Sequence, residues 1–173
     1  MRRVVVTGSE CTGKTTLARA PAERYDTVWV PEFAREFVER EGRSPVLADV
    51  EAIARGQMAR EVEVAARARE LLILDTDLLS TILYSRHYYG SCPAAVEAEL
   101  ARRPADLYLL CGIDVPWTPD GDQRDRGDRR EEMQALFRNA LLARDLDAVE
   151  VRGSHRERMR IARRAIDNLS ARP

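Results

Sequence analysis

Short apolar runs alternate with longer amphipathic stretches along almost the whole chain. The apolar runs have the length and composition of strands that are buried on both faces, as in parallel sheets. They cover residues 3–6, 27–30, 71–74, 106–111 and 148–151. Five strands that alternate with helices predict an α/β domain with a five-stranded parallel sheet and helices on both faces.

The stretches between the apolar runs keep helical spacing of their apolar residues. We expect helices over residues 14–25, 32–38, 48–70, 78–84, 94–102, 131–144 and 156–169. Pro21 lies inside the first of these, where a proline removes a hydrogen bond and clashes with the preceding turn, so we expect a kink or an early end there. With 173 residues and no linker or repeat, the chain is expected to be one domain spanning residues 1–173.

A glycine-rich loop follows the first apolar run and fits the pattern G-x-x-x-x-G-K-[ST]. Glycine permits the dihedrals with which backbone N–H groups surround a phosphate, and the helix that follows presents its positive end to the same anion. Lys14 would reach the β- and γ-phosphates, and the Thr15 hydroxyl would bind Mg²⁺. We therefore predict a site for ATP and Mg²⁺, rather than a flexible turn with a surface lysine. Its nucleotide-binding residues are expected to be Gly8, Ser9, Glu10, Cys11, Thr12, Gly13, Lys14, Thr15 and Thr16.

Carboxylates follow the second and third apolar runs. Asp75 ends the third run, the usual place for a carboxylate that holds Mg²⁺, and Asp77 projects to the same side if the extended geometry continues. Alternatively, Asp77 or Thr76 caps the next helix. Glu32 could orient or deprotonate an acceptor hydroxyl, and Arg35, one helical turn later, could bind the substrate. The alternative for Glu32 and Arg35 is a surface ion pair.

Residues 116–130 are rich in Pro, Gly, Asp and Arg, and we expect them to form a loop that closes over the nucleotide as a lid. Phosphoryl transfer develops negative charge that guanidinium groups stabilise well. The alternative is a solvated loop whose alternating charges favour solubility. Arg124 is the first candidate for catalysis, Arg126 is a candidate for nucleotide binding, and Arg129 and Arg130 are weaker candidates. Candidates for lining the acceptor site are Gln57, Tyr88 and Trp117; the alternative for Tyr88 is packing, and the alternative for Trp117 is that it anchors the loop.

The charge balance argues against a nucleic-acid surface. The chain has 28 basic and 29 acidic residues, so its formal net charge is −1. Arginines clustered on the last predicted helix leave an opening for RNA or DNA, but a solvated helix face is the expected outcome. The sequence has no run of eighteen apolar residues, so we expect no membrane span. The three cysteines lack metal-binding spacing, which is typical of reduced thiols. The phosphate loop begins at residue 8 and leaves no room for a removable signal. We therefore expect a cytoplasmic protein.

Several motifs together resemble the ribosylnicotinamide kinase domain of bacterial NadR-type proteins, within a wider group of small P-loop ATPases. These are G-S-E-C-T-G-K-T-T-L at 8–17, P-E-F-A-R-E-F at 31–37, G-Q at 56–57, L-D-T-D at 74–77, and W-T-P-D-G at 117–121 followed by Arg124. The resemblance implies a nucleoside-kinase-like core with strand order 2-3-1-4-5. It also implies transfer of the ATP γ-phosphate to the 5′-hydroxyl of nicotinamide riboside, which yields nicotinamide mononucleotide. Asp75 and Asp77 would line the catalytic crevice, and Arg124 would belong to the lid.

Longer NadR-type proteins carry an adenylyltransferase domain ahead of the kinase. Since the phosphate loop here begins at residue 8, we expect the chain not to make NAD from the mononucleotide by itself. Two alternatives stay open: a kinase for another nucleoside, and a regulatory P-loop ATPase or nucleotide-dependent binding module.

Overall fold

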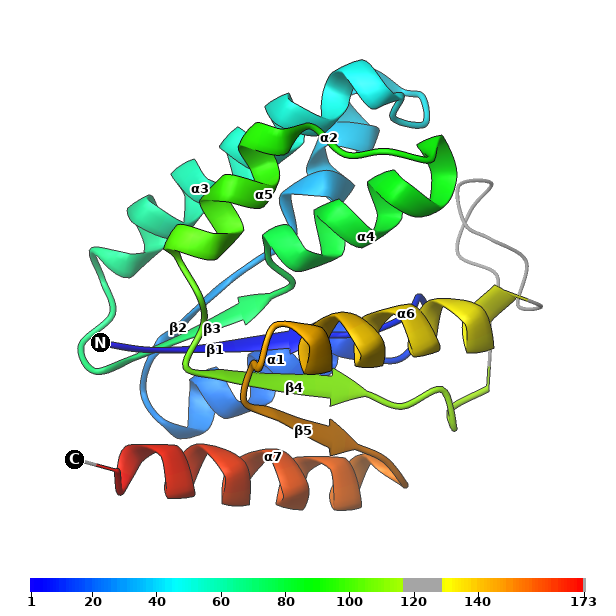
Figure 1. Cartoon of the computed structure of the whole chain (residues 1–173). Helices are drawn as coiled ribbons and strands as arrows, with labels where there is room; N and C mark the ends of the chain where they lie inside the picture. The colour runs from blue at the N-terminus through cyan, green and yellow to red at the C-terminus, as the bar shows by residue number, and fades with distance from the viewer. Residues whose placement is uncertain (117–128, 173) are drawn as a thin grey trace.

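A five-stranded parallel sheet forms the centre of the computed structural model, which describes residues 1–116 and 129–172 (Figure 1). The spatial order of the strands is β2-β3-β1-β4-β5. Their bounds are β1 Arg2–Thr7, β2 Val28–Val30, β3 Leu71–Asp75, β4 Leu107–Cys111 and β5 Ala148–Val151. This order is the one that the family resemblance implies, so the predicted fold class is confirmed.

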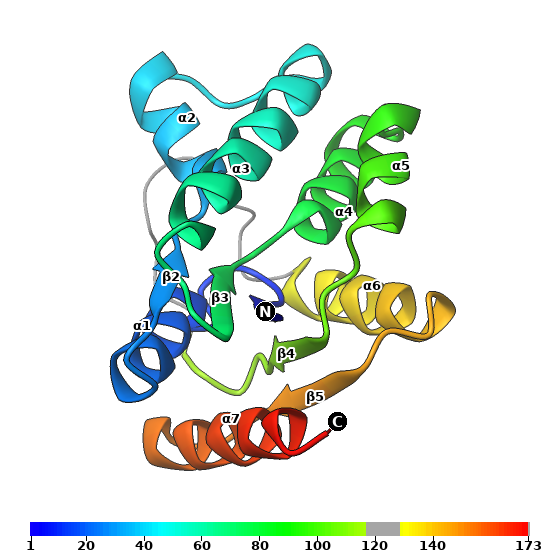
Figure 2. The same ribbon diagram turned by 90° about the vertical axis from the view of Figure 1, so that its left-hand side faces the viewer.

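Helices cover both faces of the sheet (Figures 1 and 2). One face packs against α1 and α7, and the other packs against α3, α4, α5 and α6. The short helix α2 lies against α3. The bounds are α1 Lys14–Arg24, α2 Phe33–Glu41, η1 Leu47–Asp49 (a 3₁₀ turn), α3 Val50–Ala65, α4 Leu78–Tyr89, α5 Ala94–Arg102, α6 Arg130–Ala143 and α7 His155–Ser170.

The central strand β1 shows why the strands are continuously apolar. Its side chains alternate between two cores: Val4 and Val6 pack in the cluster that contains Ile166 of α7, whereas Val5 packs in the cluster that contains Phe137 of α6. All three valines are completely buried. Because Val4, Val5 and Val6 contact no water on either face of the sheet, apolar side chains are favoured at all three positions, whereas the hydroxyl of the buried Thr7 lies 3.2 Å from that of Ser80.

Helix α1 does not end at Pro21, so that part of the prediction is wrong. The helix continues to Arg24, the proline is buried, and its carbonyl accepts a hydrogen bond from the Tyr25 N–H at 2.9 Å. A proline removes only its own N–H from the ladder, and burial of its ring in the core favours the continued helix.

Helix α3 is shorter than the predicted helix over residues 48–70. It ends at Ala65, and the carbonyl of Glu70 already accepts a hydrogen bond from Arg2 N at 2.7 Å. The intervening residues are therefore needed to turn the chain into the sheet. By contrast, α4 runs beyond the predicted Tyr84 to Tyr89, and Gly90 ends it in the left-handed conformation with φ 73°. Across the described ranges, no helix combines the length and the apolar character that crossing a bilayer requires.

Candidate active site

The loop between β1 and α1 has the backbone shape that its glycines predict. Gly8 has φ 131° and Gly13 has φ 78°, both in the region that favours glycine. A Cβ atom on Gly8 would lie 2.8 Å from the carbonyl oxygen of Cys111 at the end of β4, so a larger residue does not fit there. Within the loop, Thr12 Oγ1 donates to the carbonyl of Ser9 at 2.8 Å. The loop is therefore held in shape by its own contacts and by the neighbouring strand.

Lys14 and Thr15 begin α1 and link the loop to the end of β3. Lys14 Nζ donates to the carbonyl of Ser9 at 2.9 Å, which folds the side chain back across the loop. Thr15 Oγ1 donates to Asp75 Oδ2 at 2.6 Å. Burial raises the pKa of Asp75, while the Thr15 hydrogen bond and the charge of Lys14 oppose that rise.

The carboxylate of Asp75 has an oxygen that fits a cation. Its Oδ1 is buried and has no hydrogen-bond partner among the residues that the structure describes. Within the same residues, no group of three or more His, Cys, Asp or Glu side chains could hold a metal by itself. A magnesium ion would therefore depend on Asp75, Thr15 and the phosphate oxygens of a nucleotide, the sharing that Mg²⁺ favours in P-loop proteins.

Asp77 does not share this role, because Thr76 interrupts the extended chain. Thr76 has φ 67°, a rare value for a β-branched residue, and Asp77 consequently meets different partners from Asp75. Its two carboxylate oxygens accept hydrogen bonds from Leu79 N at 3.0 Å and from Tyr108 Oη at 2.7 Å. Burial raises the pKa of Asp77 to about 6. The expectation that Asp75 and Asp77 share one side is wrong, and Asp77 has the helix-capping role instead.

A cavity of about 400 Å³ lies beside the phosphate loop, between α2, α3 and α4. Its volume falls within the range of small-molecule sites. The structure brings five of the sequence candidates to its wall: Glu10, Glu32, Arg35, Gln57 and Tyr88. Asp77 is not part of this wall.

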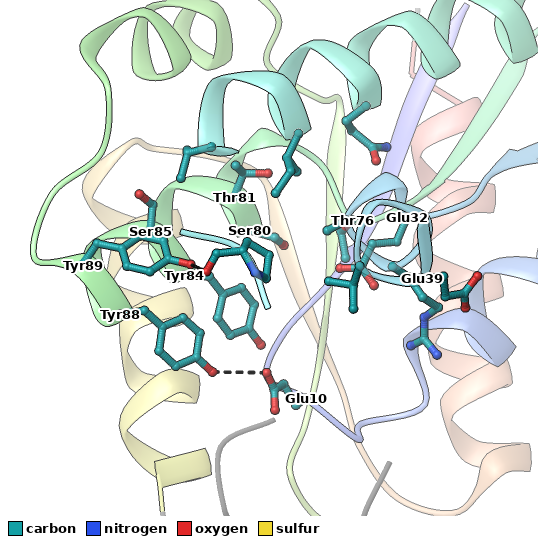
Figure 3. Close-up of a pocket in the computed structure, with 17 residues that line it drawn as sticks. Glu10, Glu32, Glu39, Thr76, Ser80, Thr81, Tyr84, Ser85, Tyr88 and Tyr89 are labelled. Carbon is teal, nitrogen blue, oxygen red and sulfur yellow. Dashed lines mark hydrogen bonds between the residues drawn. The ribbon is translucent and has the colours of Figure 1, made fainter. Parts of the chain in front are cut away.

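Aromatic and acidic side chains face each other across this cavity (Figure 3). The rings of Tyr84 and Tyr88 on α4 are stacked, with centroids 5.9 Å apart. Glu32 and Glu39 lie on the opposite side, at α2. Tyr88 Oη donates to Glu10 Oε1 at 3.4 Å, which joins α4 to the phosphate loop. We expected Glu10 only among the nucleotide-binding residues, but its side chain belongs to the cavity.

The arginine candidates of the lid have different outcomes. Arg124 and Arg126, like Trp117, lie in 117–128, outside the described residues. Arg129 forms an exposed ion pair with Glu132 at 3.1 Å.

Arg130, a weaker candidate at the start of α6, reaches the phosphate loop. Its guanidinium group donates to the carbonyl of Cys11 at 3.4 Å and to that of Val115 at 3.1 Å. Its Nε is buried and has no partner in the described part of the chain. A positive charge therefore lies next to the loop where phosphate would bind.

Sequence reasoning did not single out Arg158, which donates a hydrogen bond to the phosphate loop. This arginine of α7 is only 5 % exposed. It donates to the carbonyls of Thr12, Gly112 and Gly153 at 2.8, 3.0 and 2.9 Å, and to Asp114 Oδ1 at 2.5 Å. The arginine cluster on the last helix is therefore not a uniform solvated face, because one of its members joins three loops in the interior.

Comparison with known proteins shows the family to which the chain belongs. The family model AAA_28, described as an AAA domain, matches residues 3–158. The trifunctional NAD biosynthesis/regulator protein NadR of Escherichia coli K12 is 28 % identical over 158 residues, which is 87 % of this chain and 38 % of that protein. The Salmonella typhimurium LT2 protein of the same name is also 28 % identical, over 88 % of this chain. The chain thus spans about two fifths of the length of the curated relatives it matches, and the predicted resemblance to NadR-type proteins is confirmed.

Solved structures share the fold. A NadR protein in complex with NAD and AMP-PNP superposes with a TM-score of 0.79 at 23 % identity, and covers 99 % of this chain with 50 % of its own. A NadR protein in complex with NR gives the same TM-score. Thymidylate kinase from Ehrlichia chaffeensis superposes with a TM-score of 0.69 at 13 % identity over 97 % of this chain and 98 % of its own. The chain therefore shares the fold of these NadR proteins and of this thymidylate kinase.

Proposed function

Since the chain belongs to the AAA_28 family of AAA domains, we propose that it is an ATP-dependent small-molecule kinase that phosphorylates the 5′-hydroxyl of nicotinamide riboside. The observation that carries the proposal is the cavity beside the phosphate loop, which has a volume suited to a nucleoside and has Glu32 on its wall. In a kinase, the acceptor must lie next to the γ-phosphate, and a carboxylate at that point can receive or orient the hydroxyl proton.

The chemistry of the cavity favours a cationic nucleoside over a nucleotide. Nicotinamide riboside carries a positive charge on its pyridinium ring. The stacked rings of Tyr84 and Tyr88 can bind such a ring through cation–π contact. Among the described residues, the wall of the cavity also carries three carboxylates and only one guanidinium group, which favours a positively charged ligand. Those charged residues of the wall are Glu10, Glu32, Glu39 and Arg35. A phosphate group on the acceptor would be repelled by the same carboxylates. The NadR structure solved with NR supports the same acceptor.

In the proposed reaction, the acceptor 5′-hydroxyl attacks the γ-phosphate in line, and ADP leaves. Lys14 and Arg130 approach the phosphates and stabilise the charge that develops on their oxygens. Glu32 directs the hydroxyl proton. Thr15 and Asp75 would hold Mg²⁺, which supplies charge neutralisation on the β- and γ-phosphates when it is bound. Arg124 and Arg126 remain predicted contributors from the lid.

Nucleotide binding can be tested separately from acceptor choice. Lys14 is the only lysine of the chain, so an amine-reactive reagent followed by mass spectrometry reports on a single side chain and the amino terminus. We expect MgATP to protect Lys14 from acylation and to leave the amino terminus reactive. Equal labelling of Lys14 with and without saturating MgATP would contradict the assigned phosphate site.

Acceptor choice is tested by ADP release with MgATP and a panel of nicotinamide riboside, thymidine, thymidylate and adenosine. We expect nicotinamide riboside to stimulate release and to yield its 5′-phosphate, and Lys14→Ala to reduce the rate by at least about a hundredfold. Arg156→Ala, a change at an exposed arginine of α7, serves as the control and should leave the rate unchanged. If no acceptor stimulates ADP release, the result would favour the regulatory ATPase. If only another compound of the panel stimulates ADP release, that compound would replace nicotinamide riboside as the proposed substrate.

A further inference from the structure

The amide of Gln57 on α3 is fixed in one orientation at the wall of the cavity. Gln57 is 3 % exposed. Its Oε1 accepts a hydrogen bond at 2.8 Å from the N–H of Phe33, the first residue of α2. Since a backbone N–H can only donate, the atom that faces it must be the amide oxygen. The Nε2 group, which can only donate, is therefore directed away from α2.

The packing of α2 on α3 keeps this orientation in place. Gly56 precedes Gln57, and a Cβ atom at that position would lie 2.2 Å from the ring of Phe33, so only glycine permits the observed approach. The N-cap residue Glu32 makes no side-chain capping bond to α2. Gln57 Oε1 accepts a hydrogen bond from an N–H of the first turn instead, and Glu32 lines the cavity. The G-Q pair thus joins the two helices and aligns one amide.

The Nε2 atom of Gln57 is buried and has no hydrogen-bond partner among residues 1–116 and 129–172. A buried donor without an acceptor is unfavourable, and a site built around such a donor selects ligands that complete the bond. We propose that Gln57 determines acceptor specificity by donating to an oxygen atom carried on the base of the nucleoside, such as the carboxamide oxygen of nicotinamide riboside. The inference rests on the proposed function, because it assigns the cavity to the acceptor.

The test compares two ribosides that differ only in the carboxamide group that carries this oxygen. Nicotinamide riboside and 1-ribosylpyridinium have the same sugar and the same charge, and their dissociation constants are measured by calorimetry without ATP. We expect the wild type to bind nicotinamide riboside at least about tenfold more tightly. Gln57→Glu keeps an acceptor for the Phe33 N–H and replaces the donor with an oxygen, so the preference should fall to near one. Gln57→Met removes the donor without adding charge and should give the same loss, with a lower melting temperature.

Equal affinity of the wild type for the two ribosides would overturn the inference, as would a tenfold preference retained in both variants. Binding of neither riboside to the wild type would also overturn it. Because the readout is affinity without ATP, failure of the proposed function gives a different pattern. A riboside preference that depends on Gln57 without ADP release would leave the recognition intact and would refute the kinase, whereas ADP release without the preference would refute only the recognition.

Discussion

Arg158 offers the sharpest test of how the phosphate loop is supported. Its replacement by alanine removes the donors of three carbonyls and the ion-pair partner of Asp114 in one step, and leaves Asp114 with the hydrogen bond from the Gly153 N–H. Removing one partner of a buried ion pair typically costs about 3–5 kcal/mol of unfolding free energy. The Asp114 side chain is 35 % exposed and can be rehydrated, so we expect the lower part of this range, about 3 kcal/mol. For a domain of this size, that loss lowers the melting temperature by about 6–12 °C.

The loss should also be visible at the nucleotide site, because one of the three carbonyls belongs to Thr12 of the loop. We expect the KM for MgATP to rise by about tenfold in Arg158→Ala, since a displaced loop aligns the phosphates poorly. Arg158→Lys keeps the charge but cannot reach all four acceptors, so it should recover only part of the stability. Urea unfolding and steady-state ADP release measure the two effects, with Arg156→Ala as the control.

Two results would refute this reasoning. The first is an unfolding free energy for Arg158→Ala within about 0.5 kcal/mol of that for the exposed control, which is the range expected of a surface substitution. The second is full recovery by Arg158→Lys, which would show that charge alone, and not the set of directed hydrogen bonds, stabilises this region.

Two further predictions concern Asp77, which follows β3, and the contact between α2 and α3. Burial raises the pKa of Asp77 to about 6, so its contribution to stability is complete below about pH 4 and is lost as the pH rises through 6, by up to about 3 kcal/mol. Relative to Asp77→Asn in urea titrations, the wild type should therefore lose stability between pH 4 and 7; a difference that does not vary with pH would contradict this. Gly56→Ala should cost about 1–3 kcal/mol through overlap with the Phe33 ring and should raise the KM of the acceptor. In the double variant Gly56→Ala with Phe33→Ala, the loss of unfolding free energy should be smaller than the sum of the losses in the two single variants, because the smaller side chain removes the overlap. A loss equal to that sum would disprove the overlap.

The sheet could be predicted from the sequence because its information is local. Each strand is a continuous apolar run, and the run predicts burial on both faces without knowledge of its neighbours. The helix ends were harder to predict, since they depend on neighbouring segments. Pro21 is tolerated because it is buried, and α3 ends at Ala65 because the following residues bring the carbonyl of Glu70 to the backbone N–H of Arg2. The phosphate loop was predictable for the same reason as the strands, because its glycines, lysine and threonine act within eight consecutive positions.

The direction and burial of individual side chains required the tertiary structure. The spacing of Asp75 and Asp77 predicted a shared side, but the left-handed φ of Thr76 separates them, and the donor that holds Asp77 is Tyr108 on another strand. Nothing in the arginine-rich last helix distinguishes Arg158 from its neighbours until α7 packs behind a loop that lies 146 positions away. By itself, the sequence determined which segments are strands and helices and where the glycine-rich loop lies, because backbone periodicity and glycine dihedrals are local properties. Only the folded chain decided which polar groups are buried together, because that depends on contacts between segments that the sequence keeps far apart.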